Sequence, residues 1–182
     1  MRSILKFAGL AACLATVAVA APAAAQPPTE YGIDAGAIFG LGDQSSINVT
    51  LPASRFRIGY ALSPQWTFEP VAGLAYSKTE GTDGVLLYNL EAGALYNLRP
   101  FTVVQGGDAT PVTSAYVRPF VGLSGFTGGD TDDTELSVGA GVGVKVPWKT
   151  DLSWRLEANV GYGFDNEAAR IGLLAGLSFF PR

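Results

Sequence analysis

The sequence contains no histidine and a single cysteine, Cys13. Without histidine the chain cannot build a Ser-His-Asp or Cys-His nucleophile, and it lacks a common ligand of catalytic zinc. Charged residues make up only 15% of the 182 residues, and 16 acidic residues outnumber 12 basic ones. Because no basic stripe is available to replace phosphate counterions, we do not expect a nucleic-acid partner. We therefore predict that the protein is not an enzyme and that it needs no cofactor or metal.

The first 25 residues have the features of a secretory signal peptide. Two basic residues lie within the first six positions, and an apolar stretch follows over residues 7–21. Ala23 and Ala25 fit the −3 and −1 positions of a cleavage site, so the mature chain is predicted to begin at Gln26. An uncleaved membrane anchor and a lipidated Cys13 are the alternatives. The apolar stretch is too short and too rich in alanine for a membrane anchor. It also continues past Cys13, which disfavours lipidation of that residue.

Beyond this segment, apolar residues alternate with polar residues or glycine. In the stretch 152–162 every second residue is apolar, from Leu152 to Tyr162, and Arg155 and Glu157 lie on the opposite face. A period of two residues is typical of β-strands, and no helical period of similar strength is present. Eight strands are predicted, over residues 31–39, 56–62, 66–76, 86–98, 117–123, 136–148, 152–162 and 171–179.

Two segments depart from the simple alternation. Residues 47–51 could extend the second strand, but the alternation changes phase near Pro52, which predicts a bulge or a loop there. The connection over residues 98–115 is long for a turn. It is predicted to contain a further hairpin, formed by residues 101–105 and 111–115.

The distribution of glycine decides the class of fold. Glycines collect on the polar face of the predicted strands, where a soluble sandwich or barrel would have no use for them. An even number of antiparallel strands, apolar outward and polar inward, is typical of membrane β-barrels, whose closure leaves no unpaired edge in lipid. About 11 residues at ~3.3 Å each, tilted by ~45°, also match an apolar band of about 25 Å. We predict an all-β fold, an eight-stranded antiparallel transmembrane up-and-down β-barrel, over residues 26–182.

Aromatic residues lie near the ends of the predicted strands, as expected for side chains that anchor a barrel at the two membrane interfaces. The rim at which the first strand starts is predicted to carry Tyr31, Trp66, Tyr96, Trp148, Trp154 and Phe179. The opposite rim is predicted to carry Phe39, Tyr76, Tyr88, Tyr162 and Phe164.

Four segments carry a resemblance to a known family: residues 116–123 (YVRPFVGL), 139–145 (GAGVGVK), 155–157 (RLE) and 176–179 (GLSF). The chain resembles the small eight-stranded outer-membrane barrels of Gram-negative bacteria, a porin-like family that includes the OmpA transmembrane domain and OmpX. The resemblance implies location in the outer membrane, contact with its lipid and lipopolysaccharide, and assembly by the barrel-assembly machinery. We expect a monomer.

Charged residues on the polar face would point into the barrel. An eight-stranded barrel has an interior that side chains fill, so opposite charges are expected to pair there. The predicted ion-pair network of the lumen comprises Asp34, Glu69, Glu91, Arg118, Lys145, Arg155 and Glu157, with Arg55, Arg57, Arg99, Glu135 and Arg170 as further inward-facing charges.

Three functions remain open at this point. The first is a structural and interaction protein with a plugged lumen, contributing to envelope integrity and surface contacts. The second is a narrow pore, or a transport barrel for small hydrophobic solutes, in which the ion pairs exchange partners. The third is a soluble periplasmic β-barrel that binds a small ligand.

Overall fold

The structure is a computed structural model that describes residues 30–41, 46–77, 84–105, 108–128, 131–165 and 168–181. The predicted signal peptide and its cleavage site lie outside these residues. Within the described ranges, no helix has the length and apolar character needed to cross a membrane.

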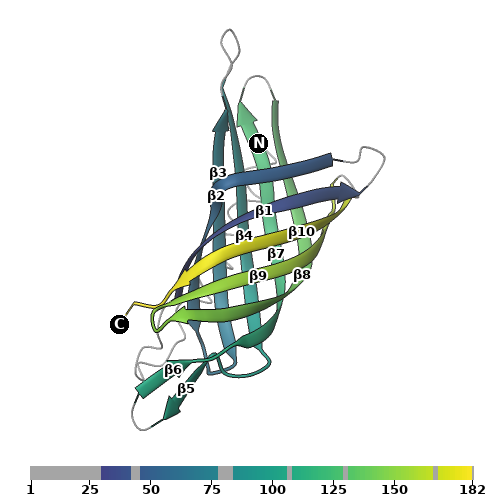
Figure 1. Cartoon of the computed structure of the whole chain (residues 1–182). Helices are drawn as coiled ribbons and strands as arrows, with labels where there is room; N and C mark the ends of the chain where they lie inside the picture. Colours follow the sequence, from purple (N-terminus) through teal and green to yellow (C-terminus); the bar gives the residue numbers. More distant parts are fainter. Residues whose placement is uncertain are drawn as a thin grey trace.

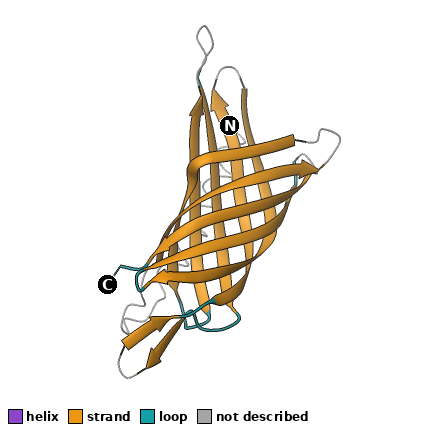
Figure 2. Cartoon of the chain, in the orientation of Figure 1, coloured by secondary structure: helices purple, strands orange, loops and turns teal. Residues whose placement is uncertain are grey.

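Eight long antiparallel strands form a closed barrel (Figures 1 and 2). Each strand pairs with its neighbours along the chain, and the first and last strands pair with each other to close the wall. The prediction of an eight-stranded antiparallel barrel is confirmed. The strands are β1 (Glu30–Leu41), β2 (Ser46–Ala61), β3 (Trp66–Ser77), β4 (Val85–Asn97), β7 (Ser114–Gly128), β8 (Thr131–Lys149), β9 (Leu152–Gly163) and β10 (Ala168–Phe179).

A small hairpin, β5 (Thr102–Gln105) and β6 (Asp108–Pro111), lies within the connection between β4 and β7. The predicted hairpin is therefore present, but its second strand was placed too late. Ser114 and Ala115 belong instead to β7, because they pair with Lys145 and Val144 of β8. Figure 1 shows this hairpin projecting from the end of the barrel where the turns between strands are short. We refer to this end as the lower end of the barrel and to the opposite end as the upper end.

Strand β2 contains the irregularity predicted near Pro52. Asp34 of β1 pairs with Arg55, whereas Gly36, two positions further along β1, pairs with Thr50, five positions away on β2. Three extra residues therefore bulge out of β2 between these pairs. Proline lacks a backbone N–H and cannot donate to the ladder, which is why it lies in this bulge.

The barrel wall is split above this point. β2 pairs with β3 only through residues 55–61 and 67–73, and Arg55 with Gly73 is the uppermost pair. Above it, β2 stays with β1 and β3 stays with β4. Figure 1 shows the first part of β2 alongside β1, turned away from the direction of β3 and β4.

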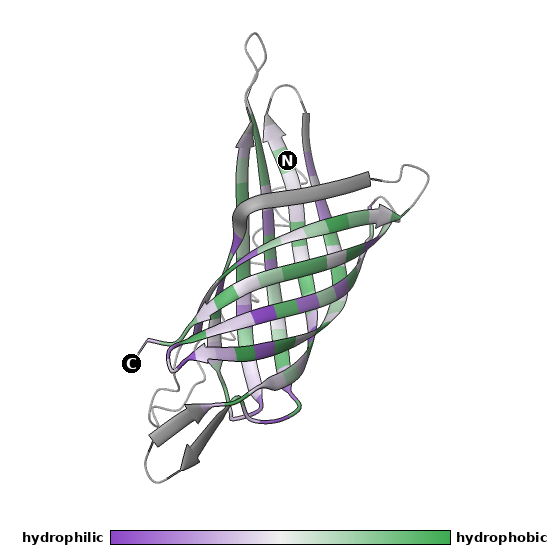
Figure 3. Ribbon diagram, in the orientation of Figure 1, coloured by the Kyte–Doolittle hydropathy of each residue, from purple (hydrophilic) through white to green (hydrophobic). Residues whose placement is uncertain are grey.

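The outer surface is apolar and the interior is charged. Leu74, Val142 and Leu156 are 63%, 60% and 51% exposed, whereas Glu69 and Arg118 are 0% and 1% exposed. Figure 3 shows hydrophobic and hydrophilic residues alternating along the strands. This is the reverse of a soluble barrel, whose apolar face would fill its interior. The structure therefore supports a transmembrane barrel and argues against the soluble alternative.

Candidate functional site: the charged lumen

Glycines on the inner wall make room for the large charged side chains of neighbouring strands. A Cβ atom at Gly93 would lie 3.0 Å from Nη1 of Arg118, and one at Gly141 would lie 2.8 Å from Oε1 of Glu157. Any larger residue at these positions would displace the charged group that lies across it. The glycines of the polar face therefore allow charged side chains to lie flat across the inner wall.

The lower part of the lumen is organised around Arg57. Its Nη1 donates a hydrogen bond of 2.5 Å to Glu30, its Nε one of 3.0 Å to Asp34, and its Nη2 one of 2.8 Å to the Ser178 hydroxyl. Lys145 donates a hydrogen bond to the second carboxylate oxygen of Glu30. Glu30 was missed by the sequence analysis because the first strand was started one residue too late. It lies four residues before Asp34, so the same alternation would have placed it inside.

The middle of the lumen is organised around Glu69, the most deeply buried carboxylate. Both of its oxygens accept hydrogen bonds from Arg155, and the bond from Nη2 measures 3.0 Å. Arg57 lies below it at 3.7 Å and Arg118 above it at 3.9 Å. The Tyr116 hydroxyl accepts a hydrogen bond of 2.6 Å from Nε of Arg155.

Higher in the lumen, Glu157 and Glu91 alternate with three arginines. Glu157 lies between Arg155 at 2.6 Å and Arg118 at 2.7 Å. Glu91 lies between Arg118 at 3.1 Å and Arg55 at 2.7 Å. Each carboxylate at this level therefore bridges two cations.

These contacts join into one continuous stack, in which every contact is between opposite charges. It contains five acidic and five basic side chains and is therefore neutral overall when all are ionised. In the described part of the chain, no group of three or more acidic or cysteine side chains is placed to hold a metal ion. The stack runs Lys145, Glu30, Arg57, Glu69, Arg155, Glu157, Arg118, Glu91 and Arg55, with Asp34 as a side branch on Arg57.

All seven residues of the predicted ion-pair network lie in this stack. Arg55 and Arg57 join them, and Glu135 and Arg170 form a separate pair of 3.2 Å whose side chains are 15% and 28% exposed. The placement of Arg99 in the lumen was wrong. This residue is exposed, because β4 ends at Asn97 and the chain has left the wall before reaching it.

The lower mouth of the lumen is covered by Phe101, which sequence analysis did not single out as a lumen residue. Its side chain is buried, its ring stacks on Phe180 at 5.0 Å, and the Lys145 ammonium lies 5.6 Å from its ring centroid. The connecting segment is held in place by hydrogen bonds from the backbone N–H of Val112 to Phe101 O and from the Ser114 hydroxyl to the Arg99 carbonyl. The sequence analysis placed residue 101 in the first strand of the predicted hairpin, but β5 begins one residue later, so strand alternation did not indicate where this side chain points.

Replacing Phe101 by alanine is expected to open the lower mouth. In a Ser153→Cys background, the thiol would report access, because Ser153 is buried in the lower lumen and the mature chain is predicted to contain no other cysteine. Alanine leaves the mouth without an apolar cover, and a barrier lower by on the order of 1 kcal/mol would make maleimide labelling about fivefold faster. Phe101→Leu, which keeps an apolar cap, is the control. Equal rates in the Ala and Leu variants would contradict this role.

The predicted interfacial aromatics lie at the two ends of the barrel. At the lower end, Trp66 and Tyr96 are paired in register with rings 5.0 Å apart, Tyr31 pairs with Phe179, and Trp148 stacks on Trp154 at 5.7 Å. At the upper end, Phe39 and Tyr76 lie in the last residues of β1 and β3, and the ring of Tyr162 contacts that of Phe164.

Two solved structures show the same architecture. The crystal structure of Neisserial surface protein A (NspA) is 15% identical, has a TM-score of 0.59, and covers 87% of this chain and 100% of its own. The N-terminal β-barrel domain of OprF from Pseudomonas aeruginosa is 16% identical, has a TM-score of 0.50, and covers 85% of this chain and 98% of its own. This chain has the fold of the small eight-stranded outer-membrane barrels. No protein-family model matches the sequence, and no curated protein matches it.

Proposed function

We propose that this protein is a structural and interaction protein of the bacterial outer membrane, with a lumen closed by side chains. It would contribute to the integrity of the envelope and present its upper loops to the surroundings. The apolar outer wall and the fold shared with NspA and the OprF barrel domain support this location. In this proposal the barrel is a monomer in contact with lipid and lipopolysaccharide, inserted by the barrel-assembly machinery.

The observation that carries the proposal is the neutral ion-pair stack. An open channel needs water along its whole length, but Glu69, Arg118, Lys145 and Arg155 are each at most 3% exposed. Separating two buried, paired charges costs several kcal/mol unless water or a new partner replaces the lost one. The stack therefore favours a closed state, and Phe101 covers its lower mouth.

The proposal also holds that the protein is not an enzyme. The carboxylates of the stack are each engaged by one or more cations, so none is left as a general base for a substrate. The chain has no histidine to take that role. Every strongly buried charge thus already has a structural partner.

Single-channel recording in a planar bilayer tests the closed lumen. The refolded mature chain should give no discrete openings, whereas Glu157→Ala should give them, because it removes the carboxylate that bridges Arg118 and Arg155. Glu135→Ala, outside the stack, is the matched control and should stay silent. Reproducible openings of the unmodified protein would overturn the proposal and favour the alternative, a narrow pore whose ion pairs exchange partners.

A further inference from the structure

The split between β2 and β3 is a break in the hydrogen-bonded ladder of the barrel wall. Among the described residues, the ladder ends at Arg55 and Gly73, and residues 74–77 of β3 pair only with β4. Residues 46–50 of β2 pair with β1. Backbone groups without partners do not persist in hydrocarbon. The edges of this split therefore require water or a polar ligand.

Two buried polar atoms lie at the base of the split. Arg55 is 8% exposed, and its Nε atom has no hydrogen-bond partner; the side-chain oxygen Oδ1 of Asn89 is also buried without one. The two residues flank Gly73 in register, one on each neighbouring strand, and all three face inward. A buried polar atom without a partner costs about 1–3 kcal/mol. A ligand head that carries both a hydrogen-bond acceptor and a hydrogen-bond donor would satisfy both atoms.

An apolar groove of about 370 Å³ lies on the outer face of the same wall. This volume is within the range of small-molecule sites, roughly 300–1,000 Å³. Arg55, Gly73 and Asn89 form one row of paired residues across the strands. The uppermost lining residues of the groove form the next row below it, so the groove reaches the base of the split. That row consists of Phe56, Ala72, Leu90, Leu123 and Leu136, which are adjacent in register across five strands.

We propose that this wall is a binding site for an uncharged amphiphile with a hydroxyl-bearing head. Its acyl chain lies in the outer groove, and its head enters the split to accept a hydrogen bond from Nε of Arg55 and donate one to Oδ1 of Asn89. This side entry reaches Arg55 at the upper end of the ion-pair stack without passing through the rest of the stack.

The charges around the split favour a neutral head over an anionic one. The guanidinium of Arg55 is already neutralised by Glu91 at 2.7 Å, and Glu91 lies two residues from Asn89 on the same, inward face of β4. Asn89 presents an oxygen, which repels an anion. A carboxylate or phosphate head would therefore add an unbalanced negative charge beside Glu91.

Photo-crosslinking in nanodiscs tests this site, with a monoacylglycerol that carries a diazirine in its acyl chain as the probe. Labelling should map to the outer residues of β3 and β4, and excess unlabelled monoacylglycerol should abolish it. The fatty acid anion of the same chain length should compete about tenfold less well, the ratio expected when one buried hydrogen bond is lost. Asn89→Leu, which removes the acceptor but keeps the size, should weaken binding by a similar factor.

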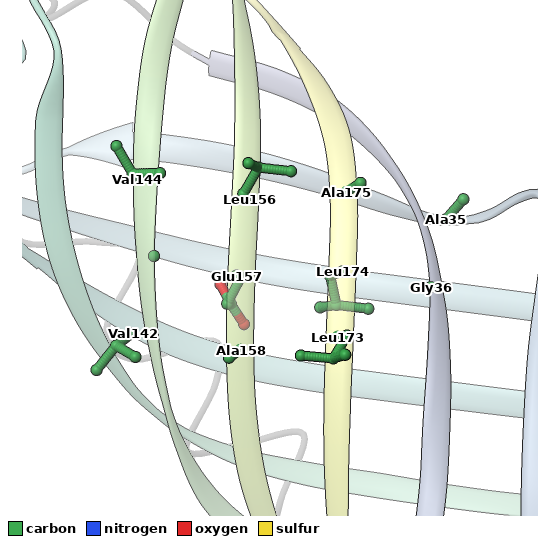
Figure 4. A pocket seen from close by; sticks show the side chains of 11 residues that line it. Ala35, Gly36, Val142, Val144, Leu156, Glu157, Ala158, Leu173, Leu174 and Ala175 are labelled. Atoms are coloured by element: carbon green, nitrogen blue, oxygen red, sulfur yellow. The ribbon is translucent and has the colours of Figure 1, made fainter.

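The opposite wall supplies a matched control. A larger apolar groove of about 780 Å³ lies over β1, β8, β9 and β10, and the residues that line it are paired from strand to strand without a break. Figure 4 shows Val142, Leu156, Leu173 and other side chains around it. Ala92→Phe fills the first groove and should abolish the labelling, whereas Ala158→Phe in the second groove should leave it unchanged.

Three results would overturn the proposal. Equal labelling of both grooves that no competitor reduces would indicate ordinary contact with bilayer lipid. Stronger competition by the fatty acid anion would show that the head is recognised by charge. Unchanged binding in Asn89→Leu and Ala92→Phe, both shown to be folded by heat-dependent gel mobility, would show that neither the split nor the groove holds the probe.

Discussion

Glu69→Gln is expected to lower the free energy of unfolding by about 3–5 kcal/mol, the range found when one partner of a buried ion pair is removed. Glu69 has no exposed surface and contacts Arg155, Arg57 and Arg118. Glutamine keeps the size of the side chain but leaves the stack with one uncompensated positive charge. Reversible unfolding of the barrel in lipid vesicles by urea, followed by tryptophan fluorescence, measures the change.

Two further variants separate the charge from the packing. Glu135→Gln breaks a pair whose side chains are 15% and 28% exposed, so its expected cost is at most about 1 kcal/mol. Adding Arg155→Met to Glu69→Gln restores the charge balance. The double variant should therefore lose less unfolding free energy than the sum of the losses in the two single variants. If Glu69→Gln costs no more than Glu135→Gln, the lumen is hydrated, and the closed-lumen proposal fails.

The direction in which each strand residue points could be predicted from the sequence. Alternation fixes the face of a strand residue, and the contrast between lipid and a charged interior makes that alternation strong. Arg118 and Glu157 were thus assigned to the lumen without knowledge of their contacts. The residues at which strands begin and end could be predicted less closely, because both faces of a strand become polar beyond the apolar band. β8 begins at Thr131, five residues before the predicted start.

Which charges would pair could not be predicted. Glu69 and Arg155 are 86 positions apart, and their contact depends on the stagger of strands that are not neighbours in the barrel. Alternation carries no information on the stagger of two strands, because sliding one strand by two residues leaves every side chain on the same face of the wall. The same limit applies to the split: the phase change at Pro52 indicated a bulge, but the loss of pairing between β2 and β3 depends on where both strands turn.

Leu156→Arg is expected to cost about 2–4 kcal/mol of unfolding free energy, because it places a cation on the lipid face near the middle of the membrane. Leu156 lies in the middle of β9, between Val144 and Ala175 of the neighbouring strands, and is 51% exposed. The matched control is Leu41→Arg at the upper end of β1, which is 48% exposed. There the arginine reaches the interface, and the expected cost is about 0–1 kcal/mol.

The comparison works because the two leucines differ in depth but hardly in exposure. In a water-soluble barrel, an exposed leucine replaced by arginine changes stability by no more than about 0.5 kcal/mol at either position. A membrane barrel instead shows a difference between the two positions, set by the depth of each residue in hydrocarbon. Unfolding of both variants in vesicles therefore measures the membrane's position along the barrel. Equal small costs would mean that hydrocarbon does not cover the middle of β9, and the transmembrane assignment would have to be abandoned.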